Sequence, residues 1–585
     1  MLEKKNVLRG ITVFALFLSL VSLIYGIIYV AMPGKAPFLN FFGVLILLAF
    51  TTNILVVYLN NLWGASGKLN AFGTFYLLFF FVAILGIWFG NLQATNTLDN
   101  VDFNRTMLLA VYPSFFGILG FGIIHLLMTL AGISDDFPIR KRFSLEEIDQ
   151  KTPFLKKILL LLIYILYLPS FFLAYVLLTC YFGMTQILVC QFGIFWAFYF
   201  FTLALLILKI YKKTPSGLRY LTGITGLAIF IIFLSPLFAI PRASTAAEAN
   251  FAAAFGEGWR AEIDPSDEVL FLPSKISIPA YFLGTPPVDF IYEQDVLFYE
   301  GTEGVDEGIR LYFDVFMPAE DNPDLPGWGS TLIRVHGGAW IAGSKGVFNM
   351  MPMNKYLASQ GYTVFDVEYG LSDRIDLLML NEMYDFIGFL NKIEIPEAAL
   401  SVLSLGAPEY LTGPFSLDDM VRHLGIFSYY LEEHAAEYGA NLDSVFISGG
   451  SAGGHFTTAM ALAISGGQHQ ELFSPELDIK GFIPFYPANK EQLIFEKLGG
   501  ADEWKDVELL VEKDSPPCLI YQGMKDGMVA YETSTSFQER YREAGNNDCA
   551  IIYLPLAAHA SDFYFNGYFN RLFLYYMERF MVMQK

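Results

Sequence analysis

Two hydrophobic patterns follow one another along the chain. Up to about residue 240, uncharged apolar stretches recur, each close to the ~20 residues that a helix needs to cross a bilayer. Pro113 and Pro169 fall inside such stretches, where a proline kinks a membrane helix without ending it. We therefore predict seven transmembrane helices, at 10–32, 38–60, 72–92, 107–132, 158–180, 187–208 and 220–240.

The basic residues between these stretches predict an orientation. If seven helices alternate in direction, most loop lysines and arginines fall on one side, which the positive-inside rule makes cytoplasmic. They are Lys4, Lys5, Arg9, Arg140, Lys141, Arg142, Lys151, Lys156, Lys157, Lys209, Lys212, Lys213 and Arg219. The loop after the third stretch carries Asp99, Asp102 and only Arg105. The N-terminus is therefore predicted to be cytoplasmic, and the chain beyond residue 240 extracytoplasmic.

Beyond residue 287, short β-branched and aromatic runs alternate with amphipathic segments. Strands are predicted at 290–299, 309–316, 331–335, 362–367, 445–448, 479–485, 518–521 and 549–553. Helices are predicted at 354–360, 416–438, about 452–463, 533–544 and 561–581, with a capping box at Ser416 and Asp419. This alternation predicts a mostly parallel sheet with helices on both faces. The predicted organisation is a membrane domain at 1–240, a juxtamembrane connection at 241–287 and an α/β domain at 288–585.

One segment interrupts the alternation. Residues 373–413 separate a predicted strand from its helix, where a few residues would suffice, and they are rich in Leu, Met and Phe. Long insertions at the ends of parallel strands commonly build lids and substrate pockets. We interpret the segment as a cap that also lines a site; additional helices that close the core are the alternative.

The two halves of the chain also differ in net charge. Residues 1–240 contain 16 Lys and Arg against 8 Asp and Glu, whereas the remainder contains 21 against 50. A strongly acidic domain disfavours nucleic acid and anionic lipid surfaces as partners. His125 is the only ionisable residue within an otherwise uncharged stretch. Such a residue is a functional candidate, or a neutral histidine that faces a neighbouring helix.

The chemistry of the second half centres on residues 449–453. Gly449, Gly450, Ser451, Ala452 and Gly453 follow a β-type run and precede a helix of small residues. This G-x-S-x-G pattern at a strand–turn–helix junction exposes a serine nucleophile above a parallel sheet. A glycine-rich turn without chemistry is the alternative, because the pentapeptide is common.

A serine nucleophile requires a base and a carboxylate that orients the base. In this type of sheet the acid and then the histidine follow the serine. His455 lies on the same helix as Ser451, and His469 precedes two further strands, which favours His559 after the last strand. Asp526 ends the preceding strand in a glycine-flanked turn, whereas Asp562 is positioned to cap the last helix.

The oxyanion donors are predicted from two places. The run His336-Gly337-Gly338-Ala339 follows the third strand and matches the HGGG-type loop, whose backbone N–H groups face the substrate oxygen. Gly337, Gly338 and Ala452 are the predicted donors, and His336 is predicted to brace the loop. Trp340 and Tyr369 are predicted to lie beside the substrate pocket.

At this point the chain resembles the α/β-hydrolase family, and within it the hormone-sensitive-lipase-like esterases and acetyl esterases. The resemblance covers about residues 290–585 and rests on four segments, at 333–340, 445–455, 522–529 and 557–563. It implies a serine hydrolase that cleaves carboxylic esters without a cofactor or metal. The chain differs from the family after the fourth strand, where Tyr369-Gly370-Leu371-Ser372 replaces the usual Tyr-Arg-Leu-Ala-Pro. The membrane half has no counterpart in this family.

The sequence thus predicts a multi-pass membrane protein whose extracytoplasmic domain cleaves short-chain or acetyl esters, including those of glycans or lipids. A membrane acyltransferase that uses the same triad is one alternative, and a non-catalytic receptor on a hydrolase fold is another. An ester substrate and the lipid bilayer are the expected partners, without nucleic acid; no oligomeric state is predicted. Cys518 and Cys549 are interpreted as buried free thiols, because a disulfide between neighbouring parallel strands would be strained.

Overall fold

The computed structural model describes residues 2–32, 39–63, 67–133, 153–179, 183–210, 216–347, 350–375, 379 and 407–585. The chain forms two compact units. Unit 1 comprises Met1–Leu178, Phe192–Leu237 and Ile276–Pro287, and unit 2 comprises Thr179–Gln191, Phe238–Lys275 and Val288–Lys585. Neither unit is continuous in sequence, because the chain passes from one unit to the other five times.

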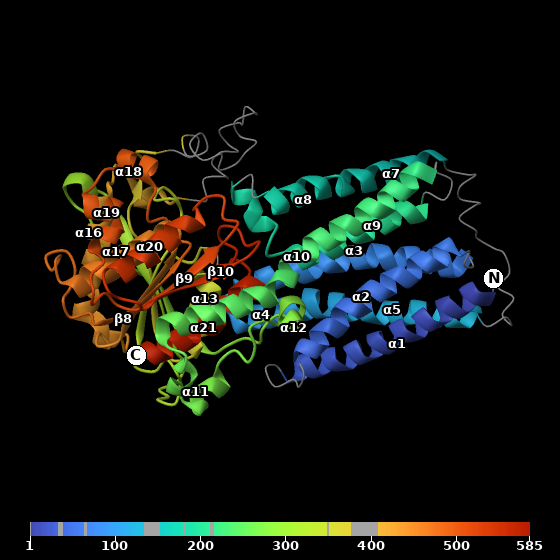
Figure 1. Cartoon of the computed structure of the whole chain (residues 1–585), viewed down its shortest axis with the longest axis horizontal. Helices are drawn as coiled ribbons and strands as arrows, with labels where there is room; N and C mark the ends of the chain where they lie inside the picture. Colours follow the sequence, from blue (N-terminus) through green and yellow to red (C-terminus); the bar gives the residue numbers. More distant parts are fainter. Residues whose placement is uncertain are drawn as a thin grey trace. The chain divides into compact units, whose positions relative to one another are not determined.

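Unit 1 is a helical bundle (Figure 1). Its described helices are α1 (Leu2–Ala31), α2 (Leu39–Leu62), α3 (Gly67–Thr95), α4 (Asn100–Thr106), α5 (Tyr112–Ile133), α7 (Pro153–Tyr167), α8 (Pro169–Thr179), α9 (Gly193–Ile210) and α12 (Ile278–Leu283). Unit 1 also contains the first part of α10 (Ser216–Phe255), up to Leu237. Within the described residues, seven helical stretches are long and apolar enough to cross a membrane. They correspond to the seven predicted apolar stretches.

Prolines are accommodated differently in three of these stretches. A π-helical turn, η1 (Met107–Val111), joins α4 to α5 just before Pro113, so the helical run continues through the proline. Pro169 begins α8 after a one-residue interruption, rather than kinking a continuous helix. In α10, the Ser235 hydroxyl donates to the carbonyl of Ile232 at 2.7 Å, next to Pro236. Such side-chain bonds re-satisfy backbone groups that prolines release, and α10 continues to Phe255 instead of ending near 240.

The short helix α12 belongs to unit 1, although its flanking segments belong to unit 2. All six of its residues are buried, and it packs against α2 and α3. The Asn91 carboxamide donates to the Phe282 carbonyl at 2.9 Å, and the Tyr29 hydroxyl donates to the Gly284 carbonyl at 2.7 Å. The later part of the predicted juxtamembrane connection is therefore an integral part of the helical bundle.

Unit 2 is built on an eight-stranded sheet with the order β1-β2-β4-β3-β7-β8-β9-β10. The strands are β1 (Phe290–Glu300), β2 (Arg310–Pro318), β3 (Thr331–Val335), β4 (Thr363–Val367), β7 (Val445–Gly450), β8 (Ile479–Phe485), β9 (Cys518–Gly523) and β10 (Cys549–Leu554). β2 pairs antiparallel with β1 and β4, and every pair from β4 to β10 is parallel. A separate two-residue bridge joins β5 (Leu371–Ser372) to β6 (Thr412–Gly413).

Helices cover both faces of this sheet, as the alternation along its strands requires. α16 (Leu417–His434), α17 (Ala452–Gly466) and α20 (Tyr531–Glu543) share one apolar core with Ile447 of β7. The next residue on the opposite face, Phe446, contacts Phe580 of α21 (Tyr568–Gln584). α13 (Met350–Ser359) lies on the α21 side, where the Tyr356 hydroxyl donates to Glu578. Among the described residues, unit 2 also contains the end of α10 (Ser216–Phe255), α11 (Pro265–Leu270), α18 (Gln492–Leu498) and α19 (Asp502–Lys505).

Local sequence signals position most elements of unit 2. The capping box at Ser416 is present, because its hydroxyl and the Asp419 carboxylate each bond the other's backbone N–H. α21, by contrast, begins at Tyr568 rather than near 561, because a turn with a left-handed residue at Ala560 precedes it. Cys518 and Cys549 are buried free thiols on adjacent strands. Most of the proposed cap at 373–413 lies outside the described residues.

Candidate active site

Ser451 occupies a strained turn between β7 and α17. Its backbone has φ 58° and ψ −120°, a conformation that a non-glycine residue adopts only when its surroundings enforce it. The turn is so tight that a Cβ on Gly449 would lie 2.4 Å from the Val335 carbonyl oxygen, and one on Gly453 would lie 2.1 Å from the same atom. The glycines therefore permit the close packing of the turn against β3. The Ser451 side chain remains partly exposed at the carboxyl end of β7.

His559 and Asp526 form a buried pair at the same edge of the sheet. His559 Nδ1 lies 2.8 Å from Asp526 Oδ2, and the two side chains are 4% and 0% exposed. The other carboxylate oxygen of Asp526 accepts the backbone N–H groups of Met528 and Val529, each at 2.9 Å. These two bonds fix the carboxylate, which in turn fixes the imidazole by accepting its Nδ1 proton. Nε2 is then the basic ring nitrogen.

Tyr486 adjoins both the serine turn and the histidine. Its hydroxyl oxygen lies 2.9 Å from the position of a Cβ on Gly450, and its ring centroid lies 4.5 Å from that of His559. Burial, with a further contribution from Asp562, raises the pKa of Tyr486 well above its usual value, so the phenol stays protonated. Sequence reasoning missed this residue; its only signal was its place directly after β8, at the carboxyl edge of a parallel sheet.

The glycine loop after β3 packs directly against the serine turn. A Cβ on Gly337 would lie 2.6 Å from the Gly450 carbonyl oxygen and 3.4 Å from the Ser451 Cβ. The next three residues, Gly338, Ala339 and Trp340, all have positive φ angles, of 135°, 53° and 63°. Three successive left-handed residues form a tight turn that no ordinary loop sequence would adopt, and Gly338 begins it. The loop therefore lies within reach of any group bound at Ser451.

Ala452 contributes the first backbone N–H of α17 next to this loop. The first four N–H groups of an α-helix have no partner within the helix. They also carry the positive end of the helix dipole, which favours a negative charge at this place. Ala452 is fully buried, and Gly337 and Gly338 are partly exposed.

His336 holds the glycine loop in place. Its ring stacks on that of Tyr369, with centroids 4.4 Å apart and an angle of 12° between the planes. Its Nδ1 lies 2.9 Å from the Gly337 carbonyl, and the Tyr369 hydroxyl donates to the His336 carbonyl at 3.1 Å. Burial lowers the pKa of His336 to about 4, so the ring is neutral at physiological pH. These contacts support the role of a brace.

The two residues predicted beside the substrate pocket are buried in the packing around the loop. Trp340 is 1% exposed and contacts the rings of His455 and Phe495, with centroids 5.6 Å and 5.2 Å away. Tyr369 is fully buried under His336. Both side chains therefore support the shape of the loop from behind.

The other histidines have different surroundings. His455 is fully buried on α17, and its Nε2 lies 2.7 Å from the Trp504 carbonyl. The ring of His469 contacts that of Trp504 in a tilted arrangement, with centroids 4.8 Å apart. A second buried His–Asp pair joins His423 to Asp306 at 3.0 Å.

The second pair differs from the first because its groups are saturated by other partners. The other ring nitrogen of His423 accepts the Gly370 N–H at 3.1 Å. The Asp306 carboxylate also binds Arg422 through both oxygens and accepts the Tyr299 hydroxyl at 2.7 Å. This network joins α16 to the loop between β1 and β2, and we assign it a structural role.

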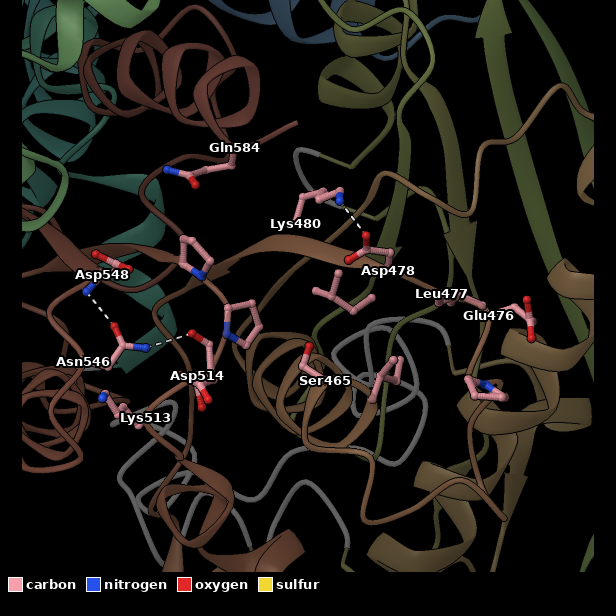
Figure 2. A pocket seen from close by; sticks show the side chains of 16 residues that line it. Ser465, Glu476, Leu477, Asp478, Lys480, Lys513, Asp514, Asn546, Asp548 and Gln584 are labelled. Atoms are coloured by element: carbon pink, nitrogen blue, oxygen red, sulfur yellow. Dashed lines mark hydrogen bonds and ion pairs between the residues drawn. The ribbon is translucent and has the colours of Figure 1, made fainter.

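An open hollow of about 770 Å³ lies at the opposite edge of the sheet (Figure 2). It is lined by residues that precede the strands, among them Asp478 before β8, Pro517 before β9 and Asp548 before β10. In parallel sheets, ligands bind at the carboxyl ends of the strands. The hollow is therefore unrelated to the chemistry at Ser451. Among the described residues, no three His, Cys, Asp or Glu side chains converge in a manner that would hold a metal ion.

The chain is similar, over part of its length, to two curated proteins of Mycobacterium tuberculosis. It is 22% identical over 260 residues to the probable carboxylic ester hydrolase LipM, a match that covers 41% of this chain and 51% of the relative. It is 25% identical over 262 residues to the esterase LipQ, covering 41% of this chain and 52% of the relative. The chain thus spans about half the length of the curated relatives it matches. No family model matches the chain.

Among solved structures, similar chains are forms of esterase 2 from Thermogutta terrifontis. The apo form is 21% identical, with a TM-score of 0.32, and the match covers 47% of this chain and 85% of the esterase. The form phosphonylated by sarin is 20% identical, with a TM-score of 0.33, and covers 46% and 84%. The relatives and structural neighbours are thus named esterases or carboxylic ester hydrolases.

Proposed function

We propose that this chain is a membrane-anchored serine hydrolase that cleaves carboxylic esters through Ser451, His559 and Asp526. The observation that carries the proposal is the combination of a strained serine at the end of β7 with a buried His559–Asp526 pair at the ends of β10 and β9. The names of the curated relatives support ester hydrolysis as the reaction.

In the proposed mechanism, His559 Nε2 removes the proton from the Ser451 hydroxyl as the serine oxygen attacks the ester carbonyl carbon. The imidazolium that forms is stabilised by Asp526, which remains ionised. The carbonyl oxygen becomes an oxyanion in the tetrahedral intermediate. Backbone N–H groups of Gly337, Gly338 and Ala452 would stabilise it, each such donor being worth roughly 3 kcal/mol in related catalytic sites.

Collapse of the intermediate releases the alcohol, which takes its proton from His559 Nε2, and leaves an acyl group on Ser451. Water then attacks this acyl-serine with His559 again as the base, and the carboxylic acid is released. We propose short acyl chains, such as acetyl, because the sequence around Ser451 and the glycine loop resembles that of the acetyl esterases.

The proposal includes a membrane location. Seven candidate spans and the distribution of loop lysines and arginines support a cytoplasmic N-terminus and an extracytoplasmic α/β unit. The natural substrate would then be an ester outside the cytoplasm, carried by a glycan or a lipid.

A single experiment tests the function and the side of the membrane. Intact cells that express the full chain are treated with a membrane-impermeant fluorophosphonate, which reacts with activated serines. We expect labelling of the wild type, none of Ser451→Ala, and loss of p-nitrophenyl acetate turnover by several orders of magnitude in that variant. Equal labelling or turnover of Ser451→Ala refutes the serine mechanism, whereas labelling only after the cells are lysed refutes the extracytoplasmic location.

A further inference from the structure

We propose that Gln191, in the connection between the membrane helices α8 and α9, is a positioning residue for His559. This inference rests on the proposed function. The connection, Thr179–Gln191, belongs to unit 2 together with the β10–α21 loop that carries His559. The chain on either side of it belongs to unit 1, so two candidate membrane helices hold its ends.

The histidine loop does not hold its own shape. Leu556 and Ala560, which flank His559, have φ angles of 60° and 48°. Left-handed backbone at residues with a Cβ is unfavourable and persists only where the surrounding structure enforces it. The near side of the loop is anchored to the turn after β9, because the Lys525 N–H donates to the Ala557 carbonyl at 2.9 Å. The far side, beyond Ala560, is held by Tyr521 of β9, which bonds Ser561, and by a second anchor closer to α21.

The α8–α9 connection supplies this anchor. The side-chain oxygen of Gln191 accepts the backbone N–H of Tyr564 at 2.7 Å, and both residues are fully buried. The carboxamide nitrogen of Gln191 donates to the Ile187 carbonyl at 2.6 Å, which fixes the side chain in this orientation. At the first residue of α21, the Tyr568 hydroxyl donates to the Cys190 carbonyl.

The same connection also approaches the strand that leads to Asp526. The Tyr521 hydroxyl on β9 bonds the hydroxyl of Ser561, two residues after His559, at 2.7 Å. Burial, Asp562 and the nearby Cys190 thiol are among the groups that raise the pKa of Tyr521, so its hydroxyl stays protonated. The Tyr521–Ser561 bond therefore ties the histidine loop to β9, the strand that leads to Asp526.

The functional consequence follows from the precision that catalysis requires. A general base must lie within hydrogen-bonding distance of the proton it removes, and a displacement of about 1 Å can lower a rate on the order of 100-fold. Loss of the Gln191 bond would remove this acceptor from the buried Tyr564 N–H and would loosen the far side of the loop. His559 would then spend less time within hydrogen-bonding distance of Ser451. The connection that makes this bond belongs to unit 2, and α9 begins at Gly193 rather than near the predicted 187.

The test uses the full-length protein in detergent micelles and three substitutions. Gln191→Met keeps the shape of the side chain and removes both hydrogen bonds, whereas Gln191→Glu retains an oxygen that accepts the Tyr564 N–H. Gln538→Met is the matched control, because the Gln538 side chain also donates to a backbone carbonyl of unit 2, that of Cys549 at 2.7 Å, but on α20. For each protein, kcat and KM for p-nitrophenyl acetate, the rate of fluorophosphonate labelling and the Tm are measured.

We expect Gln191→Met to lower kcat and the labelling rate at least tenfold with KM changed less than twofold, because the bond acts on the base rather than on substrate binding. Gln191→Glu should retain most of the activity, and Gln538→Met should retain kcat even where its Tm falls equally. The proposal is overturned if Gln191→Met has the kcat of the wild type, if Gln191→Glu is equally impaired, or if Gln538→Met loses as much kcat.

Two further measurements complete the design. If Gln191→Met does not fold, Tyr568→Phe removes the hydroxyl that donates to the Cys190 carbonyl, and we expect it to lower kcat several-fold at unchanged KM; an unchanged kcat overturns the proposal. Ser451→Ala separates the two levels of inference. Residual turnover in Ser451→Ala refutes the serine mechanism, and with it this inference, whereas an inactive Ser451→Ala beside a fully active Gln191→Met refutes only the role of Gln191.

Discussion

At the scale of single residues, the candidate site depends on a few backbone conformations that cost energy. Ser451, Gly338, Ala339, Trp340 and Tyr486 all have positive φ angles. Strain of this kind gathers at functional sites, where neighbouring contacts maintain it. Specific contacts surround these strained turns: Asp526 is bonded to His559, and the ring of His336 stacks on that of Tyr369.

Asp526 provides the sharpest prediction at this scale. We expect Asp526→Asn to lower kcat about 10³–10⁴-fold, because an amide at this position favours the wrong tautomer of His559 and does not stabilise the imidazolium. The exposed Asp502, whose side chain is 91% exposed, provides the control substitution Asp502→Asn. Steady-state kinetics with p-nitrophenyl acetate measure the effect, and circular dichroism checks the fold. A drop of less than tenfold would show that Asp526 does not orient the base.

Single residues also show which parts of the candidate site could be predicted from the sequence. Gly449, Ser451 and Gly453 predicted the serine turn, because only glycine tolerates the approach to β3. Chain order alone selected Asp526 and His559, and the two are in contact. Tyr486 and Gln191 were not predictable, because their roles depend on groups that are distant in sequence, such as Tyr564. Nothing in the local pattern near 191 indicates a partner more than 300 residues away.

At the scale of elements, α17 joins the serine turn to the core. The helix begins at Ala452 and carries His455 one turn later, against Trp340 and Phe495. Burial lowers the pKa of His455 to about 4, so the folded protein holds this ring neutral. The unfolded chain binds a proton there below about pH 6.5.

The resulting pH dependence has a definite sign. Because the folded-state pKa of His455 is lower than that of the unfolded chain, its contribution to stability is complete above pH 6.5 and is lost as the pH falls towards 4. The loss amounts to roughly 3 kcal/mol at most. We therefore expect the Tm of His455→Gln to rise relative to the wild type as the pH is lowered from 6.5 to 4.

The comparison must be made against the wild type at each pH, because other buried groups act in the opposite direction. Burial raises the pKa of Asp366, Glu368 and Glu578 to about 7, so their contributions to stability increase as the pH falls. Differential scanning fluorimetry at several pH values measures both proteins. A difference in Tm that stays constant from pH 7 to pH 4 would contradict a neutral buried His455.

At the scale of the whole molecule, neither unit is one continuous stretch of sequence, because each contains a short segment that lies within the sequence of the other. α12 returns to the helical bundle after α10 has left it, and Thr179–Gln191 leaves the bundle to join the α/β unit. The hydrophobic pattern predicted the seven spans and the order of strands and helices. It did not predict these exchanges, because a six-residue helix such as α12 is too short to carry a membrane signal.

The packing of α12 yields a prediction for the bundle. A Cβ on Gly43 of α2 would lie 2.7 Å from the Cβ of Ile278, so Gly43→Ala should displace α12 and lower the stability by about 1–3 kcal/mol. Gly10 of α1 has no such neighbour within 4 Å, and Gly10→Ala is the control. The Tm of the detergent-solubilised protein measures both substitutions. Equal Tm values for the two variants would contradict the close contact between α2 and α12.

The bond between Gln191 and Tyr564 also imposes an order on synthesis. The two residues are 373 positions apart, so at typical elongation rates of roughly 5–20 residues per second about 20–75 s separate their appearance. During that interval Gln191 has been synthesised, but Tyr564, whose N–H it accepts, has not. The histidine loop therefore acquires its final shape only when the bundle has been inserted and the last helix has been made. The proposed hydrolase would therefore be inactive as a nascent chain, and the onset of its activity would indicate that its assembly is complete.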